Sequence, residues 1–561
     1  MSATRRLYLY LITAISLGVT AGGAGQLISL ILDLTVRSRV DQVGGQEFSA
    51  GQLSLGLAML AIGAPLWYFF WRAVQQRTAG DVEETGSALR KFYLNLVLVV
   101  ASLTAVSGTS ETLRWLLGGA IAVEFQSGAL AAAIVAFLIW LYHWKVAEKE
   151  GHPSPAAGTL RRWYMYILST YGLVSFATSV AQFINAGVLS LPFFSPSLVE
   201  AGFWNGATQM AVANIITGGG VWYFHWFRMA KDDYDSVLRQ VYFYLLTVSG
   251  GAIAALVAAT VTVQRLVTFA IGGVTVPPGS YFSFIGWAIP TILIGTAIWG
   301  YHQRLAKEES SRITERRESA ERIHHYLMSF IGLSTMSAGI ILLFGLIINL
   351  LIGITGQIII AGTTWWQGLL GLSLALLIVG TPLWLYYWGG VLKRIEAGGI
   401  EEWRATSRRI FLYAVVVLSI GTLIADLVNI VYQILNGILQ AHADTIIRES
   451  RWSIQTLLVA GPWLWYHLRI IRIDQKRGSE ALAARRKVTL LTYDRGGTTS
   501  EKFEKRLGYR ITTMLRAGTG EDGILTDEEL NRIAAEIEAS PANRVLLVKT
   551  GDNFAVIAYE G

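Results

Sequence analysis

The chain contains no cysteine and unusually few charged residues. Without cysteine there can be no disulfide, no thiolate nucleophile and no zinc or iron–sulfur cluster held by cysteine. Asp, Glu, Lys and Arg make up only 15% of the 561 residues, and 53% are hydrophobic. A soluble protein carries about 25% charged residues. These values exclude a soluble globular enzyme and a disordered chain, and they predict an integral membrane protein with the lipid bilayer as its first partner.

The apolar residues are concentrated in segments long enough to cross a bilayer, which takes about 20 residues in a helix. Twelve such segments are present: 7–34, 50–71, 92–118, 129–144, 163–190, 207–227, 241–272, 282–302, 325–355, 366–388, 410–439 and 454–468. The stretch 129–144 is short, so we expect its helix to extend by a turn at each end. The predicted fold class is an all-α polytopic membrane protein with twelve transmembrane helices.

The basic residues lie on one set of connecting loops. The loops that include both chain ends hold 31 Lys and Arg, whereas the opposite loops hold only 4, which are Arg37, Arg39, Arg448 and Arg451. Cytoplasmic loops of membrane proteins carry such an excess. We therefore predict a multi-pass protein of the cytoplasmic (inner) membrane with both termini in the cytoplasm. The net charge of +7 is explained by these loops, so no nucleic acid partner is predicted.

The twelve segments form a repeat of two helices. Most odd-numbered segments open with a basic residue, such as Arg6, Lys91 or Arg162, followed by spaced aromatic residues. The third position of the opening is aromatic or His in all six copies: Tyr8, Tyr93, Tyr164, Tyr242, His324 and Phe411. Each even-numbered segment ends in an aromatic cluster, as in Trp140-Leu141-Tyr142-His143-Trp144. The predicted hairpins are 1–80, 81–155, 156–235, 236–315, 316–400 and 401–475.

Both aromatic motifs fall at the cytoplasmic ends of their helices. Tyr and Trp favour the membrane–water boundary because the ring is apolar and the polar atom can stay hydrated. We expect the basic residues before them to extend toward the lipid headgroups. Since each hairpin brings two clusters to the same depth, a row or ring of aromatic residues is also expected there.

This pattern resembles an uncharacterised family of bacterial and archaeal membrane proteins, a domain of unknown function whose paired helices open in Arg-x-x-Tyr-x-Tyr. The resemblance covers roughly residues 5–470. The chain departs from the pattern at Asn95, Gln240, His324 and Phe411. The resemblance implies the hairpin fold and carries no activity.

A histidine occupies the same column near the end of four hairpins: His143, His225, His302 and His467. Phe70 and Tyr387 take this place in the other two. A histidine repeated at one depth can bind haem, a metal or a quinone, or relay protons. It can equally be an interfacial residue that donates a hydrogen bond to a backbone carbonyl, and Phe and Tyr at the same position favour this second interpretation.

A few ionisable residues fall within the spans, where they are costly and are candidates for function. Asp426 and Asn429 lie toward the outer side of their span, and they are the candidate site for an ion or other ligand. Glu111 and Arg114 are three residues apart and can pair on one helix face. Inter-helix hydrogen bonding is the alternative role for such groups. Glycines four apart, such as Gly18 and Gly22, predict close helix packing.

The motifs of known catalytic sites are absent. The sequence has no phosphate-binding loop, no His-Glu-x-x-His and no Gly-x-Ser-x-Gly. No catalytic residue and no metal site is therefore predicted, and an enzyme is the less favoured class.

The sequence changes character after a basic linker at 476–487. Residues 488–561 predict a small cytoplasmic α+β domain of order β-α-α-β-β. A strand is expected at 488–493, helices at 501–516 and 526–539, and strands at 545–548 and 554–559. The loop 518–523 is predicted to be a turn.

The sequence leaves three functions open. We favour a non-enzymatic scaffold or sensor-like array that couples the helices to a cytoplasmic protein partner through residues 488–561. The alternatives are a transporter or channel with a site near Asp426, and a redox subunit that binds haem or quinone through the histidine column.

Overall fold

The structure is a computed structural model. It describes residues 3–36, 45–79, 81–152, 154–194, 202–234, 236–310, 314–354, 365–440, 446–483, 487–494, 497–507, 510–517, 525–540, 542, 544–550 and 553–559. The chain divides into two compact units, Met1–Gly389 and Gly390–Gly561.

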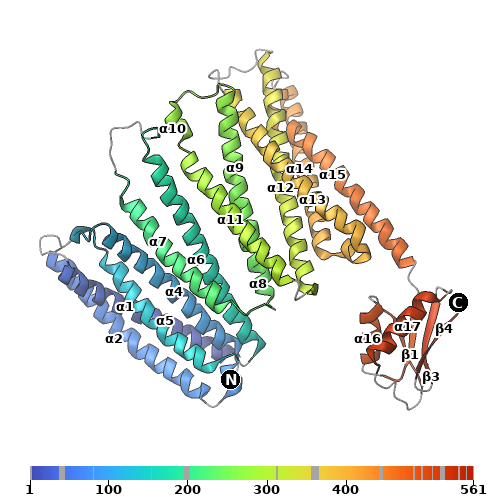
Figure 1. Cartoon of the computed structure of the whole chain (residues 1–561), viewed down its shortest axis with the longest axis horizontal. Helices are drawn as coiled ribbons and strands as arrows, with labels where there is room; N and C mark the ends of the chain where they lie inside the picture. Colours follow the sequence, from blue (N-terminus) through green and yellow to red (C-terminus); the bar gives the residue numbers. More distant parts are fainter. Residues whose placement is uncertain are drawn as a thin grey trace. The chain divides into compact units, whose positions relative to one another are not determined.

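Long helices fill the first unit, and the ten predicted spans up to 366–388 are helical there (Figure 1). The main helices are α1 (Ala3–Val36), α2 (Gly45–Thr78), α4 (Ala88–Leu117), α5 (Ser127–Glu150), α6 (Pro155–Leu189), α7 (Gly206–Trp222), α9 (Ser249–Ala270), α11 (Ile285–Ser310), α12 (Thr314–Ile354) and α13 (Trp365–Arg404), the last of which continues into the second unit. Short helical pieces are α3 (Val82–Thr85), η1 (Ala122–Glu124), α8 (Val237–Val241) and α10 (Pro278–Phe282). As expected, α5 extends beyond 129–144 at both ends.

Successive helices pack in pairs, which we number as hairpins 1 to 5 in chain order. The pairs are α1 with α2, α4 with α5, α6 with α7, α9 with α11, and α12 with α13. Each hairpin then contacts the next one along the chain: α1 packs on α4 and α5, α4 on α6 and α7, α6 on α11, and α12 on α8. The two-helix repeat of the sequence is therefore also the unit of packing.

Glycines permit the closest approaches inside these hairpins. A methyl group on Gly332 of α12 would lie 2.6 Å from the backbone nitrogen of Trp384 in α13. One on Gly23 of α1 would lie 2.9 Å from the carbonyl oxygen of Gly56 in α2. Small residues let membrane helices approach in this way. The predicted glycine packing holds for Gly22 and Gly23, whereas a methyl group on Gly18 or Gly25 would meet nothing within 4 Å.

Ten helices among the described residues are long and apolar enough to cross a membrane. The other two predicted spans, 207–227 and 454–468, are helical but are not in this group. A π-helical segment, η2 (Tyr223–Met229), follows α7 and leaves only 17 residues of regular α-helix there. Charged residues such as Arg448, Glu449 and Arg469 lie close to both ends of the apolar part of α15 (Ile446–Ala483).

A second π-helical segment, η3 (Tyr242–Val248), lies between α8 and α9. Two side chains support its wider turns by bonding five residues back. The Thr247 hydroxyl donates to the carbonyl of Tyr242 at 3.1 Å, and the Ser249 hydroxyl donates to that of Tyr244 at 2.5 Å. Wider turns of this kind change the direction of the side chains on them. The aromatic motifs of hairpins 3 and 4 lie on η2 and η3.

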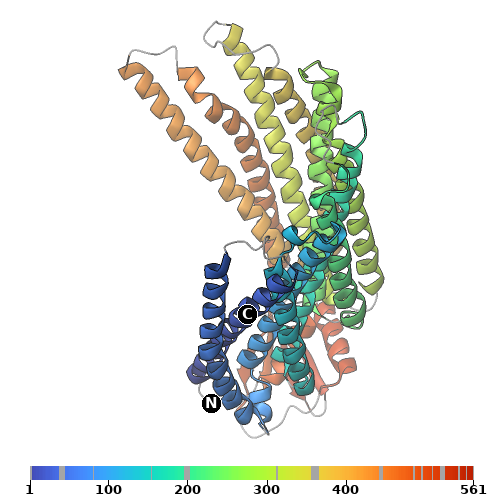
Figure 2. The ribbon, with the colours of Figure 1, turned by 90° about the vertical axis from the view of Figure 1, so that its left-hand side faces the viewer.

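The second unit begins with hairpin 6, in which α14 (Thr406–Leu439) packs against α15 (orange in Figure 2). The segment 476–487, predicted as a linker, is helical as far as Ala483 because α15 continues through it.

The C-terminal domain is an α+β fold with one strand more than predicted. Its elements are β1 (Lys487–Thr492), α16 (Thr498–Leu507), β2 (Thr512–Leu515), α17 (Asp527–Ala539), β3 (Arg544–Thr550) and β4 (Asn553–Ala558). The helix expected over 501–516 is wrong: it ends at Leu507, and β2 follows. The physical reason is that Thr512 and Thr513 are β-branched and pair with β1, so tertiary pairing overrides the helical pattern. The predicted turn 518–523 lies outside the described residues.

The sheet has the strand order β2-β1-β3-β4, with β1 parallel to both of its neighbours and β4 antiparallel to β3. Side chains of both helices join one face of the sheet in the core, including Phe503 of α16 and Ile533 of α17 with Leu490 and Val545. The predicted capping box at the start of α17 is formed, since Thr526 and Glu529 exchange their side-chain and backbone bonds.

Candidate functional site: the histidine column and its ion pairs

The four column histidines make the same local bond. In each one, Nδ1 lies 2.8 to 2.9 Å from the carbonyl oxygen four residues earlier: Ile139 for His143, Val221 for His225, Ile298 for His302 and Trp463 for His467. A bond to a carbonyl requires a proton on Nδ1, so Nε2 is the acceptor nitrogen of each neutral ring. All four side chains are buried. The expected bond to the backbone is thus present.

The third-position aromatic residue of each hairpin packs on the column residue of the same hairpin. The ring centroids are 6.0 Å apart for Tyr93 and His143, 5.3 Å for Tyr164 and His225, and 5.5 Å for Tyr242 and His302. The Tyr164 hydroxyl lies 3.1 Å from Nε2 of His225, and that of Tyr242 lies 3.5 Å from Nε2 of His302. The two repeated motifs of the sequence therefore meet as one pair per hairpin.

The remaining hairpins keep this pair with other residues. Hairpin 5 exchanges the two types, since His324 on α12 faces Tyr387 on α13 with a centroid distance of 5.4 Å. Hairpin 6 has Phe411 with His467 at 5.9 Å, and hairpin 1 has Tyr8 with Phe70 at 6.5 Å. The repeat therefore retains a contact between two rings. The histidine itself can be replaced, or it can lie on the other helix of the hairpin.

Tryptophans connect one hairpin to the next. Trp71 of hairpin 1 packs on Tyr93 of hairpin 2 with a centroid distance of 5.6 Å. Trp144 packs on Tyr164 of hairpin 3 at 6.1 Å, and Trp226 stacks on Tyr242 of hairpin 4 at 4.7 Å. We call these contacts, together with the ring pairs above, the aromatic row. Aromatic contacts of the kind expected from the sequence are therefore repeated in hairpins 1 to 4.

A second repeated contact was missed by the sequence analysis. In five hairpins an arginine at the start of the first helix pairs with a carboxylate beyond the aromatic cluster of the second. These hairpin ion pairs are Arg6–Glu84, Arg90–Glu150, Arg162–Asp233, Arg239–Glu309 and Arg408–Asp474. Both oxygens of Glu309 bond to Arg239, at 2.6 and 2.5 Å. The spacing of about 60 to 80 residues within each repeat could have revealed the pairs.

Two of these arginines, Arg6 and Arg162, are among the basic residues expected to extend toward the headgroups, and each pairs with a carboxylate. Arg90, Arg239 and Arg408 are almost fully buried. A guanidinium buried this deeply needs a charged partner, and a carboxylate that accepts two bonds satisfies it. The Arg6 guanidinium likewise bonds Glu84, outside the helical spans, and holds the pKa of that carboxyl below its usual value. These ion pairs thus close five of the hairpins at one end.

The polar candidates within the spans bond across or along their own hairpins. Thr456 on α15 donates to Asp426 on α14 at 2.7 Å, and Asn429 donates to Ser453 at 2.9 Å. Glu111 and Arg114 form the expected pair on α4, at 2.9 Å. Asp426 and Asn429 are therefore brought together with α15 partners, and Glu111 and Arg114 belong to another hairpin in the other unit.

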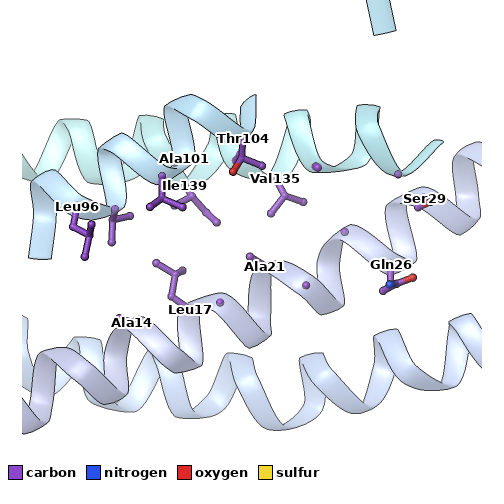
Figure 3. Close-up of a pocket in the computed structure, with 18 residues that line it drawn as sticks. Ala14, Leu17, Ala21, Gln26, Ser29, Leu96, Ala101, Thr104, Val135 and Ile139 are labelled. Atoms are coloured by element: carbon purple, nitrogen blue, oxygen red, sulfur yellow. The ribbon is translucent and has the colours of Figure 1, made fainter. Parts of the chain in front are cut away.

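An apolar cavity of about 510 Å³ lies between α1, α4 and α5 (Figure 3). Leu17 and Ala21 of α1 face Val135 and Ile139 of α5 across it. Gly18 and Gly25 also line it, which explains why these two glycines contact no neighbouring helix. The cavity contains no column histidine among its lining residues, so it is separate from the aromatic row.

This arrangement joins helices through ring contacts and ion pairs. Among the described residues no group of three or more His, Asp or Glu side chains is placed to hold a metal ion. In hairpins 3 and 4 a tyrosine hydroxyl faces the histidine Nε2, the atom that would bind an iron or a quinone. In hairpin 2 both His143 Nε2 and the Tyr93 hydroxyl are buried and have no hydrogen-bond partner among the described residues.

Comparison with known proteins identifies the family and adds no activity. No curated protein and no solved structure matches the chain. The family described as Domain of unknown function (DUF5671) matches residues 6–129, 126–193 and 322–450. The family therefore matches three regions of the chain, which is consistent with a repeated domain. Because these segments cover more than half of its length, the chain belongs to the DUF5671 family, a domain of unknown function.

Proposed function

We propose that this protein is a non-enzymatic membrane scaffold, in which six joined hairpins hold a cytoplasmic domain at the inner membrane. The observation that supports the proposal is the ion pair that recurs from hairpin to hairpin. In five hairpins an arginine at the start of the first helix pairs with a carboxylate beyond the aromatic cluster of the second, and three of these arginines, Arg90, Arg239 and Arg408, are buried. Residues that a transporter or enzyme would present to a substrate are thus used to close the repeats.

The proposed topology has twelve crossings with both termini in the cytoplasm. Its support is the distribution of Lys and Arg over the loops, together with the pairing of α7 and α15 with helices that can cross a membrane. In this topology the hairpin ion pairs lie at the cytoplasmic ends of the helices, and the outward ends carry few charges.

The absence of cysteine makes the topology directly testable. Single cysteines at exposed positions would be labelled with an impermeant maleimide in cells and in inverted membrane vesicles. Phe203→Cys and Arg448→Cys are expected to react in cells, whereas Lys231→Cys and Lys476→Cys are expected to react only in inverted vesicles. These pairs flank α7–η2 and α15. If both cysteines of a pair react from the same side, the helix between them does not cross the membrane.

The scaffold role is tested by cross-linking in native membranes. The full chain and a chain ending at Ala483 would be compared after photo-cross-linking. A cytoplasmic protein joined to the full chain and lost with the shortened one is the expected result. A shortened chain with the same cross-linked partners would contradict the role of the C-terminal domain.

One observation favours a redox function as the second candidate, which is the buried Nε2 of His143 without a partner. If that nitrogen binds haem, the purified protein shows a Soret band that disappears in His143→Ala and persists in His225→Ala, because Nε2 of His225 already bonds the Tyr164 hydroxyl. A colourless purified protein, together with unchanged stability of His143→Ala, would contradict the redox function and leave the scaffold.

A further inference from the structure

The sheet of the C-terminal domain has one covered face and one open face. Helices α16 and α17 contact each other and pack on the same face, as Figure 1 shows. Side chains alternate between the faces along each strand, and paired residues on neighbouring strands share a face. Leu491 pairs with both Met514 and Val548, so these three lie together on the face that the helices leave open.

The middle of the open face is apolar. It continues from Leu491, Met514 and Val548 through Leu546 to Ile557, which pair across β3 and β4. Met514 is 53% exposed and Ile557 is 46% exposed, which is a large fraction for apolar side chains of a small domain. Exposed contiguous apolar surface with a polar rim marks an interaction site.

The charge on the open face has one sign. By strand alternation Lys487 and Arg544 lie at one end, and Arg516, whose guanidinium lies over the ring of Tyr493 at 5.1 Å, lies at the other. Among the described strand residues this face has no Asp or Glu. On the covered side, α17 is acidic, with Asp527, Glu528, Glu529, Glu536 and Glu538 against Arg532, whereas α16 carries both signs of charge. The domain therefore has a basic apolar open face, and its acidic helix lies on the opposite side.

The chain keeps this domain next to a bilayer. The apolar part of α15 ends at Leu468, and the helix continues to Ala483. At about 1.5 Å per residue the helix carries the chain only about 22 Å further before β1 begins. A basic surface with exposed apolar side chains, held at this distance, has the composition of a surface that binds anionic lipid.

We infer that the open sheet face docks on an anionic membrane surface, with Met514 and Ile557 at the headgroup level and Lys487, Arg516 and Arg544 next to lipid phosphates. The inference rests on the proposed function only in assigning the cytoplasmic leaflet as that surface. Docking leaves the acidic side of α17 facing the cytoplasm, where it is available to a protein partner.

The test uses the full chain in nanodiscs, with an environment-sensitive fluorophore on the single cysteine of Met514→Cys. Nanodiscs of phosphatidylcholine are compared with nanodiscs that also contain phosphatidylglycerol. In the anionic nanodiscs we expect a blue shift of the emission, loss of most quenching by aqueous iodide and strong quenching by a headgroup nitroxide. Ile557→Cys is the second reporter on the same face, and Ala535→Cys on the exposed side of α17 is the matched control without these changes.

Charge reversal completes the test. Lys487→Glu with Arg516→Glu in the Met514→Cys chain is expected to restore iodide quenching, and high salt should act in the same direction. A label on Met514 that behaves like that on Ala535 overturns the inference. Shielding that is equal in neutral and anionic nanodiscs also overturns it, because protein would then cover the face. Both leaflets of a nanodisc have the same lipids, so either outcome is independent of the topology experiment.

Discussion

The hydroxyl group of Tyr164 joins two hairpins through two side chains. It accepts a hydrogen bond from Nε1 of Trp140 in hairpin 2 at 3.0 Å, and it lies 3.1 Å from Nε2 of His225 in hairpin 3. Because Nδ1 of His225 donates to a backbone carbonyl, Nε2 accepts the tyrosine proton. One buried hydroxyl thus orients the histidine and ties it to the preceding hairpin.

Removing this hydroxyl is expected to destabilise the protein. Tyr164→Phe leaves the buried Nε1 of Trp140 and Nε2 of His225 without their partner, which costs about 1–3 kcal/mol. Tyr93→Phe is the matched control, since the Tyr93 hydroxyl has no partner among the described residues and its loss should cost less than about 0.5 kcal/mol. The measurement is the free energy of unfolding in mixed micelles. Equal losses for both variants would contradict the structural role of the Tyr164 bonds.

The hairpin ion pairs should matter more than an exposed pair. Asp474→Asn leaves the guanidinium of Arg408, which is only 2% exposed, without its carboxylate. Breaking a buried pair in this way costs about 3–5 kcal/mol. Glu111→Gln breaks a partly exposed pair with Arg114 and should cost about 0–1 kcal/mol. Thermal unfolding of the detergent-solubilised variants checks the order, and a larger loss for Glu111→Gln would refute it.

The Arg6–Glu84 pair makes stability depend on pH. The Arg6 guanidinium lowers the pKa of Glu84 in the folded protein, so the folded state favours the ionised carboxyl. This contribution is present above the pKa of the unfolded carboxyl, about 4.3, and it is lost as the pH falls through the lower folded value. We expect Glu84→Gln to be less stable than the natural chain at pH 7 and to converge with it in acid.

The control for this pH dependence is Glu83→Gln, because Glu83 is 87% exposed at its side chain and lies 3.7 Å from Arg6. Melting temperatures between neutral and acidic pH measure both variants. A gap between Glu84→Gln and the natural chain that stays constant into acid would show that the carboxyl charge makes no contribution.

Glycine substitutions test the hairpin packing. A methyl group on Gly108 of α4 would overlap the carbonyl oxygen of Ala129 on α5, whereas one on Gly18 would contact nothing within 4 Å. Overpacking of this kind costs about 1–3 kcal/mol, so Gly108→Ala should lower the melting temperature. Gly18→Ala is expected to be neutral or slightly stabilising, because Ala favours the helix. A larger loss for Gly18→Ala would place a neighbour in the cavity of Figure 3.

The periodic patterns of the sequence predicted most of the fold. The length of each apolar segment predicted the long helices, and the recurring aromatic motifs predicted the hairpin repeat. Both patterns are local, because they reflect burial of nearby residues at a fixed depth. The prediction failed at residues 512–515, where pairing of Thr512 and Thr513 with β1 outweighs the helical pattern before them. The column histidines and their backbone bonds were predicted for the same local reason.

The sequence by itself determined the membrane class, the two-helix repeat and the placement of aromatic rings near one end of each helix. Only the tertiary structure decided which rings meet, because Tyr387 and His324 exchange places in hairpin 5 while their contact persists. It also decided that each buried arginine pairs with a carboxylate about 60 to 80 residues away in its own hairpin. Local patterns encode helices and their depth, whereas partners this far apart are selected by helix packing and by the cost of a buried, unpaired charge.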